Sequence, residues 1–305
     1  MNLVKLHKCG PEVSEICLGA DHFGTKFDRD LAFELLDRFR DAGGNFVDTA
    51  NIYARDFENG FSRSERILGE YLKSRGKASL VVATKGGHPN VKTMHTPRLS
   101  RVEIERDLDE SLKSLGLDAI DLYYLHRDDQ SKSIGEIIEI LEEFVRKGKI
   151  RHYAASNYTK SRLEESIKFS ESHNCQGFSA VSNMWSPAVE NPGAPLSGDD
   201  TLVRFDDSDL ELFEKSNLAF IPYSSTAKGW FAKRANGEVS EKLAKVFENE
   251  NNLHLLENLK ARGGSVQTAL LEYICSIKLN SSPIIPITSV SNADQLSDLL
   301  SVHAE

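Results

Sequence analysis

The chain contains 305 residues, of which 40% are hydrophobic and 27% are charged, and its formal net charge is −9. This composition is typical of a globular protein with a sizeable core, so disordered and fibrous classes are excluded. Nucleic acids and anionic membrane surfaces are bound mainly through Lys and Arg, which makes both unfavourable partners for an acidic chain. We therefore expect a folded protein that acts on a small molecule, and its oligomeric state stays open.

Targeting signals and cysteine spacing indicate the expected compartment. The first residues form no apolar leader, and no run approaches the roughly 20 apolar residues of a membrane span. Cys9, Cys17, Cys175 and Cys275 are scattered without CxxC spacing, which favours free thiols over disulfides or a zinc site. We predict a cytoplasmic protein that binds no metal.

Eight short apolar runs recur along the chain, with amphipathic segments between them. The runs predicted as strands are residues 16–20, 45–48, 80–85, 120–126, 150–156, 178–183, 219–223 and 284–287. Such alternation indicates a parallel sheet with crossover helices. With eight units and no Pro/Gly/Ser-rich linker, the sequence predicts an α/β fold in which residues 1–305 form a single-domain, eight-stranded parallel (β/α)8 TIM barrel.

Several helices and two long loops can be placed between these strands. Residues 133–147 carry one apolar stripe, another stripe ends before Gly116, and a third follows Ser265. The loops 186–205 and 224–264 both follow predicted strands, and we expect one further helix at about 240–259 in the second loop. Aromatic residues in the loops (Phe23, Trp185, Trp230 and Phe231), together with His22, are expected either to line a pocket or to pack onto the barrel.

Polar side chains stand at or beside the ends of six of the eight apolar runs. They are Asp48, Lys85, His126, Ser156 with Asn157, Asn183 and Tyr223. Because active sites of (β/α)8 enzymes form at the carboxyl ends of the strands, these groups are expected to converge at one mouth. For any single position, the alternative is that a strand simply stops where burial stops.

Lys85 is the most informative of these residues, because a lysine at a buried barrel rim requires an anionic partner. Asp48 could supply that charge, although such a pair can also be purely structural. Tyr53 follows Asp48 by five residues and should reach the same mouth. A neighbouring ammonium group stabilises the phenolate, so we expect the Tyr53 pKa to be lowered. His126 could orient a substrate oxygen or the phenol.

Four segments together resemble consecutive motifs of the aldo-keto reductase family. They are Asp48-Thr49-Ala50 with Tyr53, Ala83-Thr84-Lys85, Leu122 to His126, and Ser156-Asn157. The resemblance covers essentially the whole chain. It implies a catalytic tetrad of Asp48, Tyr53, Lys85 and His126, in which hydride passes between nicotinamide C4 and the carbonyl of an aldehyde, ketone or sugar. Tyr53 would be the general acid/base, and family members use no metal.

The same resemblance implies a set of cofactor contacts. The residues are Gly19, Ala20, Asp48, Ser156, Asn157, Asn183, Tyr223, Ser224, Ala227, Lys228, Gly229, Ser289, Ser291 and Gln295. Ser182 stands where the family usually has glutamine, so the carboxamide would be held more loosely. Residues 289–295 lack the basic side chains that usually meet the 2′-phosphate. We favour NADP(H) because members of the resembled family usually use it, and NAD(H) is the alternative.

Two other functions use the same residues. Lys85 could form a Schiff base in a (β/α)8 aldolase, although Tyr53, Ser156-Asn157 and Tyr223 would then have no role as a set. Some members of the family bind the cofactor as redox-sensing subunits with little turnover, and an intact site does not exclude that role.

The triplet His126-Arg127-Asp128 also resembles a kinase motif, but no Gly-rich loop or Asp-Phe-Gly accompanies it, so we attribute it to chance.

Overall fold

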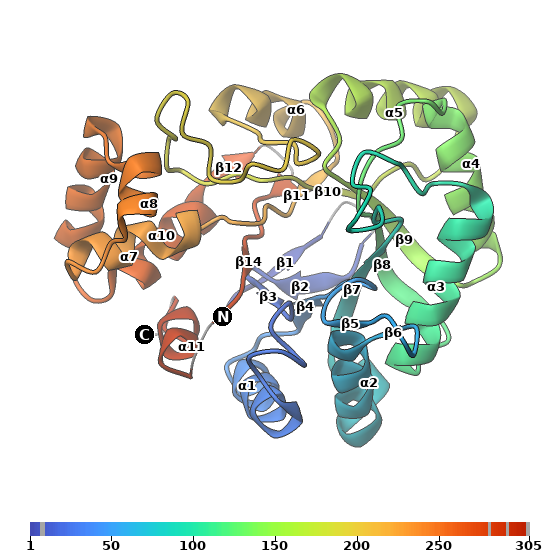
Figure 1. Ribbon diagram of the computed structural model, residues 1–305, viewed down its shortest axis with the longest axis horizontal. Coiled ribbons are helices and arrows are strands. Elements are labelled where there is room, and N and C mark those ends of the chain that lie inside the picture. Colours follow the sequence, from blue (N-terminus) through green and yellow to red (C-terminus); the bar gives the residue numbers. More distant parts are fainter. Residues whose placement is uncertain (7–9, 280–281, 291–292, 303–305) are drawn as a thin grey trace.

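The computed structural model describes residues 1–6, 10–279, 282–290 and 293–302, and its centre is an eight-stranded parallel sheet (Figure 1). The strands lie in the order β11-β10-β9-β8-β7-β4-β3-β14. Their bounds are β3 (Cys17–Gly19), β4 (Phe46–Asp48), β7 (Val81–Gly86), β8 (Ile120–Leu125), β9 (Ile150–Ser156), β10 (Ala180–Ser182), β11 (Ala219–Phe220) and β14 (Ile287–Thr288). Each predicted strand therefore overlaps a strand of the sheet, although the run predicted at 284–287 overlaps β14 at Ile287 alone.

Hydrogen bonds between the segments at β11 and β14, the two ends of the strand order, close this sheet into a barrel. Ile284 forms a parallel bridge with Phe220, and the Ile285 amide donates to the Phe220 carbonyl at 2.8 Å. The Ile287 amide donates to the Pro222 carbonyl at 2.9 Å. The predicted (β/α)8 barrel is thus confirmed. The run predicted for 219–223 ends as a strand at Phe220, two residues before Pro222, which has no N–H to give to a ladder.

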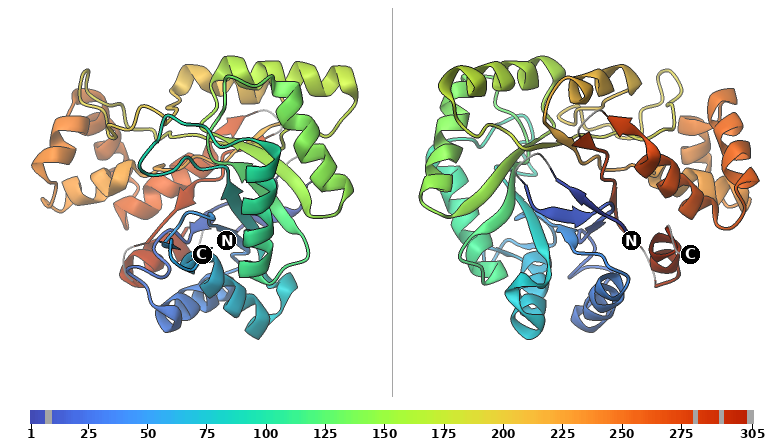
Figure 2. Two further views of the ribbon diagram at one scale, coloured as in Figure 1. Left: turned by 45° about the vertical axis from the view of Figure 1, so that its right-hand side comes forward. Right: turned by 180° about the vertical axis from the view of Figure 1, so that it is seen from behind.

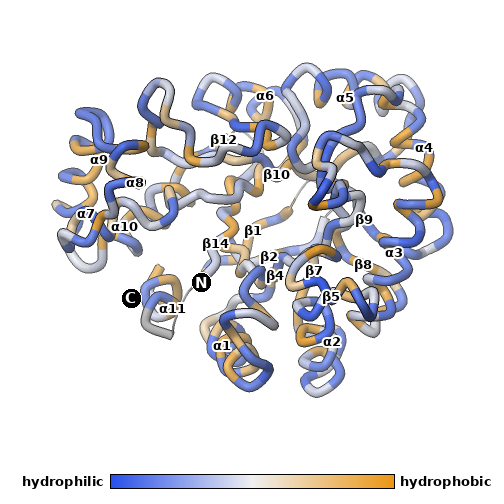
Figure 3. The backbone as a smooth tube through the Cα atoms, viewed as in Figure 1, coloured by the Kyte–Doolittle hydropathy of each residue, from blue (hydrophilic) through white to orange (hydrophobic). Residues whose placement is uncertain are grey.

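Helices surround the barrel, and in Figure 3 their hydrophobic sides alternate with hydrophilic ones along each helix. Their bounds are α1 (Arg29–Asp41), α2 (Arg63–Arg75), α3 (Arg101–Leu115), α4 (Ile134–Arg146), α5 (Lys160–His173), α6 (Glu211–Glu214), α7 (Trp230–Ala235), α8 (Glu241–Phe247), α9 (Glu250–Ala261), α10 (Val266–Ser276) and α11 (Ala293–Leu300). Three short 3-10 turns are η1 (Lys77–Ser79), η2 (Asp207–Leu210) and η3 (Ala227–Gly229). None of the helices in the described ranges combines the length and the apolarity that crossing a membrane requires.

The predicted helix boundaries hold where caps mark them. Ser133 caps α4 by accepting from the Glu136 amide, Gly116 ends α3 with a left-handed φ of 64°, and Ser265 caps α10. The single helix predicted at about 240–259 is wrong. The chain breaks after α8, and the Asn249 side chain starts α9 as a new cap by accepting from the Asn252 amide. Asparagine favours N-caps over helix interiors, so Asn249 was a signal for this break that the sequence interpretation did not use.

Alternate residues of the strands point into the barrel, where they form a cluster separate from the helix–sheet core. The inward-facing members are Cys17, Phe46, Ala83, Leu122, Tyr124, Ala154, Ala180, Ala219, Ile221 and Ile285. Leu6 and Val13 belong to the same cluster, and they flank or lie in an antiparallel hairpin of β1 (Leu3–Lys5) and β2 (Glu12–Ser14). This hairpin, which the sequence did not predict, covers the amino-terminal end of the barrel (Figure 2). The opposite, carboxyl end is left for polar residues.

The described residues also form two smaller hairpins. One joins β5 (Arg55–Asp56) to β6 (Phe61–Ser62) directly after Tyr53, and the other joins β12 (Lys278–Leu279) to β13 (Ser282–Pro283) before the last barrel strand. The first of these fixes the loop that follows β4, because the Ser62 hydroxyl donates to the Tyr53 carbonyl at 2.7 Å.

Candidate active site

Asp48, Lys85 and His126 reach the same space because they continue the inward-facing rows of three adjacent strands. Side chains alternate across a strand, so Asp48 lies on the face of Phe46, and Lys85 lies on the face of Ala83. His126 directly follows β8, two residues after the inward-facing Tyr124. The polar groups expected to converge at the carboxyl ends of the strands are therefore close together in space.

Lys85 is held at the centre of this group. Its ammonium donates to Oδ1 of Asp48 in a short ion pair, and to the Thr49 carbonyl at 2.9 Å. Nζ also lies 3.5 Å from the hydroxyl of Tyr53. Both members of the ion pair have side chains only 3% exposed. Burial lowers the pKa of Lys85, but Asp48 and Tyr53 raise it more, so the pKa lies above its ordinary value and the group stays charged.

Tyr53 is placed by a turn that is pinned to the neighbouring strand. Its amide donates to the Ala50 carbonyl at 3.0 Å, and the Asn51 amide donates to the Lys85 carbonyl at 2.9 Å. The expectation that the Tyr53 pKa is lowered is wrong. Burial raises this pKa, and Lys85 lowers it by less, while Asp48 and Asp21 act in the same direction as burial. Tyr53 is therefore a protonated phenol at neutral pH.

His126 faces Tyr53 across the mouth of the barrel. The two rings lie edge to face, with 6.1 Å between their centroids. Burial, with smaller contributions from His88, Arg127 and Lys85, holds the pKa of His126 well below its ordinary value, so the imidazole is neutral. Its Nδ1 is buried and finds no hydrogen-bond partner among the described residues.

The loop after His126 is fixed by an arginine of α5. Arg162 pairs with the carboxylate of Asp128 at 3.1 Å and donates to the Lys132 carbonyl at 2.6 Å. Arg127 donates to the His126 carbonyl at 2.8 Å and to Thr201 at 3.0 Å. The His-Arg-Asp triplet is thus part of the scaffold of this loop.

A cavity of about 660 Å³ lies beside Tyr53, Lys85 and His126. It extends to Ser289 and Gln295, which follow the last barrel strand. Most residues predicted for the cofactor or for catalysis line it, namely Gly19, Asp48, Tyr53, Lys85, His126, Ser156, Asn157, Tyr223, Ser224, Lys228, Gly229, Ser289 and Gln295. Ala20 and Ala227 are fully buried and do not line it. Ser291 lies outside the described residues.

Asn183 has a supporting position behind the cavity. Its Oδ1 accepts from the amides of Asn157 and Tyr158 at 2.7 and 3.3 Å, and its Nδ2 donates to the Tyr158 carbonyl. These bonds hold Asn157 in a left-handed conformation, with φ of 61°. Asn157 in turn accepts from Tyr223 and from the Val203 amide. The structure thus places Asn183 in the scaffold of the Asn157 loop, away from the cavity wall.

The rim of the cavity after β11 has an unusual backbone. Ser224, Ala227 and Lys228 all have positive φ, between 52° and 56°, and Gly229 continues the run at 76°. A left-handed conformation costs a non-glycine residue free energy, and such strain is found most often where a ligand is held. This rim carries Lys228 beside the cavity.

Other features also fit an extended ligand. A side chain at Gly19 would collide with the Ser289 hydroxyl, so the strand end stays open there. Oγ1 of Thr288, another cavity-lining residue, is buried and finds no hydrogen-bond partner within the described ranges. No group of three or more His, Cys, Asp or Glu side chains in the described part of the chain is placed to hold a metal ion.

Some cavity-lining residues could not be found from the sequence. They are Asp21, Lys26, His88, Arg127 and Lys233. Most lie in loops whose conformation depends on distant contacts. Of the loop aromatics that were expected either to line a pocket or to pack onto the barrel, Phe23, Trp185, Trp230 and Phe231 are buried in the core, and His22 lines the cavity.

Comparison with known proteins identifies the family. The model of the aldo/keto reductase family matches residues 15–304, which is almost the whole chain. The chain belongs to the aldo/keto reductase family. This confirms the resemblance stated from the motifs.

Three relatives show the range of this similarity. Norsolorinic acid reductase of Emericella nidulans is 27% identical, over 94% of this chain and 73% of its own length. A probable voltage-gated potassium channel subunit beta of Oryza sativa subsp. japonica is 29% identical, over 83% of this chain and 73% of its own. Aryl-alcohol dehydrogenase (NADP(+)) of Phanerodontia chrysosporium is 33% identical, over 49% of this chain and 42% of its own. Two of these relatives carry names of oxidoreductases.

Proposed function

We propose that this single barrel domain is an NAD(P)(H)-dependent oxidoreductase that interconverts an aldehyde or ketone, including sugars, with the corresponding alcohol. The observation that carries this proposal is the position of Lys85, whose ammonium contacts both the buried Asp48 carboxylate and the Tyr53 hydroxyl. A phenol beside a permanent positive charge can give a proton to a developing alkoxide and can take it back. Family membership and the names of the relatives support the same reaction class.

When bound in the cavity, a nicotinamide ring would supply or accept the hydride. Tyr53 donates its proton to the carbonyl oxygen during reduction, and Lys85 stabilises the phenolate that remains. Asp48 holds the ammonium of Lys85 in place, which keeps the charge oriented toward the phenol. His126 is neutral, so it can donate a hydrogen bond to the substrate oxygen without competing for the proton.

The residues along the cavity fit a dinucleotide. Ser156 and Asn157 would hold the carboxamide, and Tyr223 would lie against the nicotinamide ring. Asn157 already bonds to Tyr223, Ser156, the Val203 amide and the His126 carbonyl, so carboxamide binding requires exchange of at least one of these bonds. Lys228 on the strained rim would neutralise part of the pyrophosphate charge.

We propose NADP(H) as the favoured cofactor and NAD(H) as the alternative. The relative from Phanerodontia chrysosporium carries NADP(+) in its name, which supports this order. Ser289 and Gln295 line the cavity near the start of α11 and could bind a 2′-phosphate without basic side chains. Titration of the protein with NADPH and with NADH, followed by fluorescence, distinguishes the two.

The central experiment is a screen of aldehydes, ketones and sugars with both cofactors, run on the wild-type chain and on Tyr53→Phe. We expect the variant to lose turnover by a factor of roughly 10² to 10⁴ while cofactor binding is retained. Full activity of Tyr53→Phe would refute the proposed mechanism.

A second candidate is a cofactor-binding, redox-sensing subunit with little turnover. The similarity to the rice channel subunit beta, over 83% of this chain, is the observation that favours it. Tight binding of NADPH without turnover of any carbonyl compound in the screen would support this role. The Schiff-base aldolase is disfavoured, because such a lysine needs a lowered pKa, and that of Lys85 is raised.

A further inference from the structure

A second imidazole stands at the mouth of the barrel, three residues after Lys85. The ring of His88 lies edge to face against the ring of His126, with 4.7 Å between their centroids. His88 lines the cavity of about 660 Å³ and also an adjoining pocket of about 190 Å³. The reaction proposed above assigns no role to this side chain.

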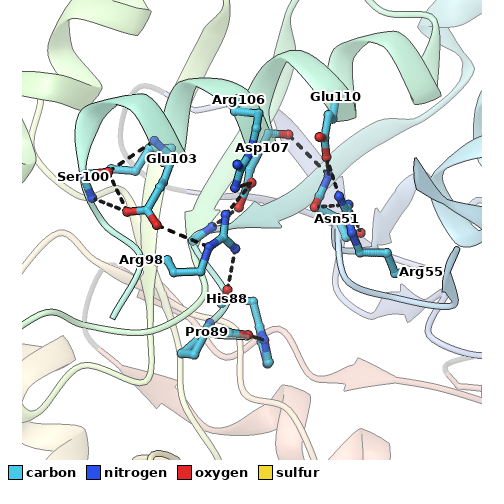
Figure 4. A network of polar contacts seen from close by, with 12 residues as sticks. Asn51, Arg55, His88, Pro89, Arg98, Ser100, Glu103, Arg106, Asp107 and Glu110 are labelled. Atoms are coloured by element: carbon cyan, nitrogen blue, oxygen red, sulfur yellow. Dashed lines mark hydrogen bonds and ion pairs between the residues drawn. The ribbon is translucent and has the colours of Figure 1, made fainter. Parts of the chain in front are cut away.

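The loop that carries His88 is held by an ion pair between Arg98, which is partly exposed, and the buried Asp107 (Figure 4). Oδ2 of Asp107 in α3 accepts from the Gly87 amide at 3.0 Å, and Arg98 donates to the His88 carbonyl at 2.7 Å. Arg98 and Asp107 also bond to each other at 2.9 Å, and Asp107 is only 2% exposed. The position of His88 is therefore set by a specific polar network that is anchored on the buried Asp107.

Two glycines allow this approach. A Cβ at Gly86 would collide with the Tyr123 hydroxyl, and Gly87 has a φ of 71°, which lies in the left-handed region. The loop can therefore turn sharply after β7 and bring His88 over the catalytic residues.

The hydrogen bonds of His88 determine what its free nitrogen can do. Nδ1 lies 2.7 Å from the Pro89 carbonyl, which can only accept, so Nδ1 carries the proton. Burial and the nearby Arg127 hold the pKa of His88 below its ordinary value, although the Pro89 bond opposes them, so the ring is neutral. Nε2 then presents a lone pair, and it makes no hydrogen bond to any described residue.

Nε2 of His88 is an acceptor beside two cationic side chains. Lys85 and Arg127, which also line the cavity, can only donate hydrogen bonds. A substrate whose carbonyl oxygen lies between Tyr53 and His126 would place its neighbouring carbon close to His88, because the two imidazoles are in contact.

We propose that His88 is a specificity-determining residue whose Nε2 accepts a hydrogen bond from a hydroxyl group on the carbon next to the substrate carbonyl. The inference rests on the carbonyl chemistry of the proposed function. It predicts a preference for α-hydroxy carbonyl compounds over carbonyl compounds that lack this hydroxyl.

The test compares two aldehydes that differ by one hydroxyl, 2-hydroxypropanal and propanal, in steady-state assays with NADPH. We expect kcat/KM of the wild-type chain to be about tenfold higher for 2-hydroxypropanal, the value of one net hydrogen bond. His88→Phe keeps a ring against His126 but removes the acceptor, so the preference should fall to about one. His88→Gln retains an acceptor and should keep part of the preference.

His254→Phe is the matched control, because it replaces an exposed imidazole on α9. Thermal melting of each variant checks that the fold is intact. A preference that is equal in wild type and His88→Phe, or an equal loss for both aldehydes, would overturn the inference alone. If the wild-type chain reduces neither aldehyde nor any other carbonyl compound, the proposed function fails, and this inference fails with it.

Discussion

The Tyr223 hydroxyl donates a hydrogen bond of 2.6 Å to Oδ1 of Asn157. This bond joins the segment after β11 to the loop after β9. Tyr223→Phe removes this bond and leaves the ring in place. We expect the dissociation constant of NADPH to rise up to about tenfold, because Asn157 is then less well oriented for the carboxamide.

Fluorescence titration measures this change. Tyr273→Phe on α10, whose side chain is partly exposed, serves as the control. Unchanged NADPH affinity in Tyr223→Phe would show that the Tyr223–Asn157 bond does not support cofactor binding.

The pH dependence of turnover should differ between the two directions. The Tyr53 pKa lies above its ordinary value near 10, mainly because of burial, so the phenol keeps its proton through neutral pH. We expect kcat/KM for reduction to stay level from about pH 6 to pH 9, whereas oxidation of the alcohol should accelerate as pH rises.

The pKa of His126 is well below 6.5, so protonation of this imidazole should cause no fall in the reduction rate near pH 6.5. Initial rates in both directions, measured in buffers of constant ionic strength, test this. A reduction rate that falls between pH 6 and pH 8 would contradict the assigned protonation states.

Breaking the Asp48–Lys85 pair should affect both stability and turnover. Lys85→Met leaves the buried Asp48 carboxylate unpaired, and we expect a loss of about 3–5 kcal/mol in unfolding free energy. Asp48→Asn combined with Lys85→Met removes both charges and should recover much of that loss, while turnover stays low. Urea unfolding and steady-state assays separate the two effects. If the double variant were no more stable than Lys85→Met, the unpaired charge could not be the cause.

A buried carboxyl outside the active site should make stability depend on pH. Glu65 of α2 is fully buried, its Oε1 accepts from the Thr84 hydroxyl at 2.6 Å, and burial raises its pKa to about 7. The folded state therefore holds this proton more tightly than the unfolded chain. The stability that protonated Glu65 contributes is complete below the pKa of the unfolded chain, near 4.5. It is lost as pH rises through the folded-state pKa of about 7.

Glu65→Gln keeps an acceptor for Thr84 and cannot ionise. We expect it to gain roughly 3 kcal/mol relative to the wild type on going from pH 4 to pH 8, measured by urea unfolding at both values. Glu70→Gln, an exposed residue of the same helix, should show a much smaller pH-dependent difference. A Glu65→Gln advantage that is the same at both pH values would contradict the buried, raised-pKa carboxyl.

The convergence of Asp48, Lys85 and His126 could be predicted from the sequence because a polar residue stands out at the end of an apolar run. Lys85 lies near the end of β7 and His126 directly follows β8, both in mainly apolar runs, and their inward direction follows from the alternation of side chains. The direction of the Tyr53 pKa could not be predicted in the same way. It depends on how deeply packing buries the phenol, and no sequence pattern encodes that depth.

Loop residues were missed for a related reason. His88 reaches the mouth through its contacts with Asp107 and Arg98, which lie 10 to 19 residues away in sequence. The β1–β2 hairpin was missed because strands of three residues are too short to show a clear period.

That hairpin also determines how the protein can be attached to a surface. Met1 bonds through its amino group to the Ala42 carbonyl, beside the turn that precedes β4, at the end of the barrel that Leu6 and Val13 cover. Tyr53 and His126 lie at the opposite end. A linker joined at the amino terminus would therefore leave the mouth facing the solution, and immobilised protein should exchange small molecules as readily as the free chain.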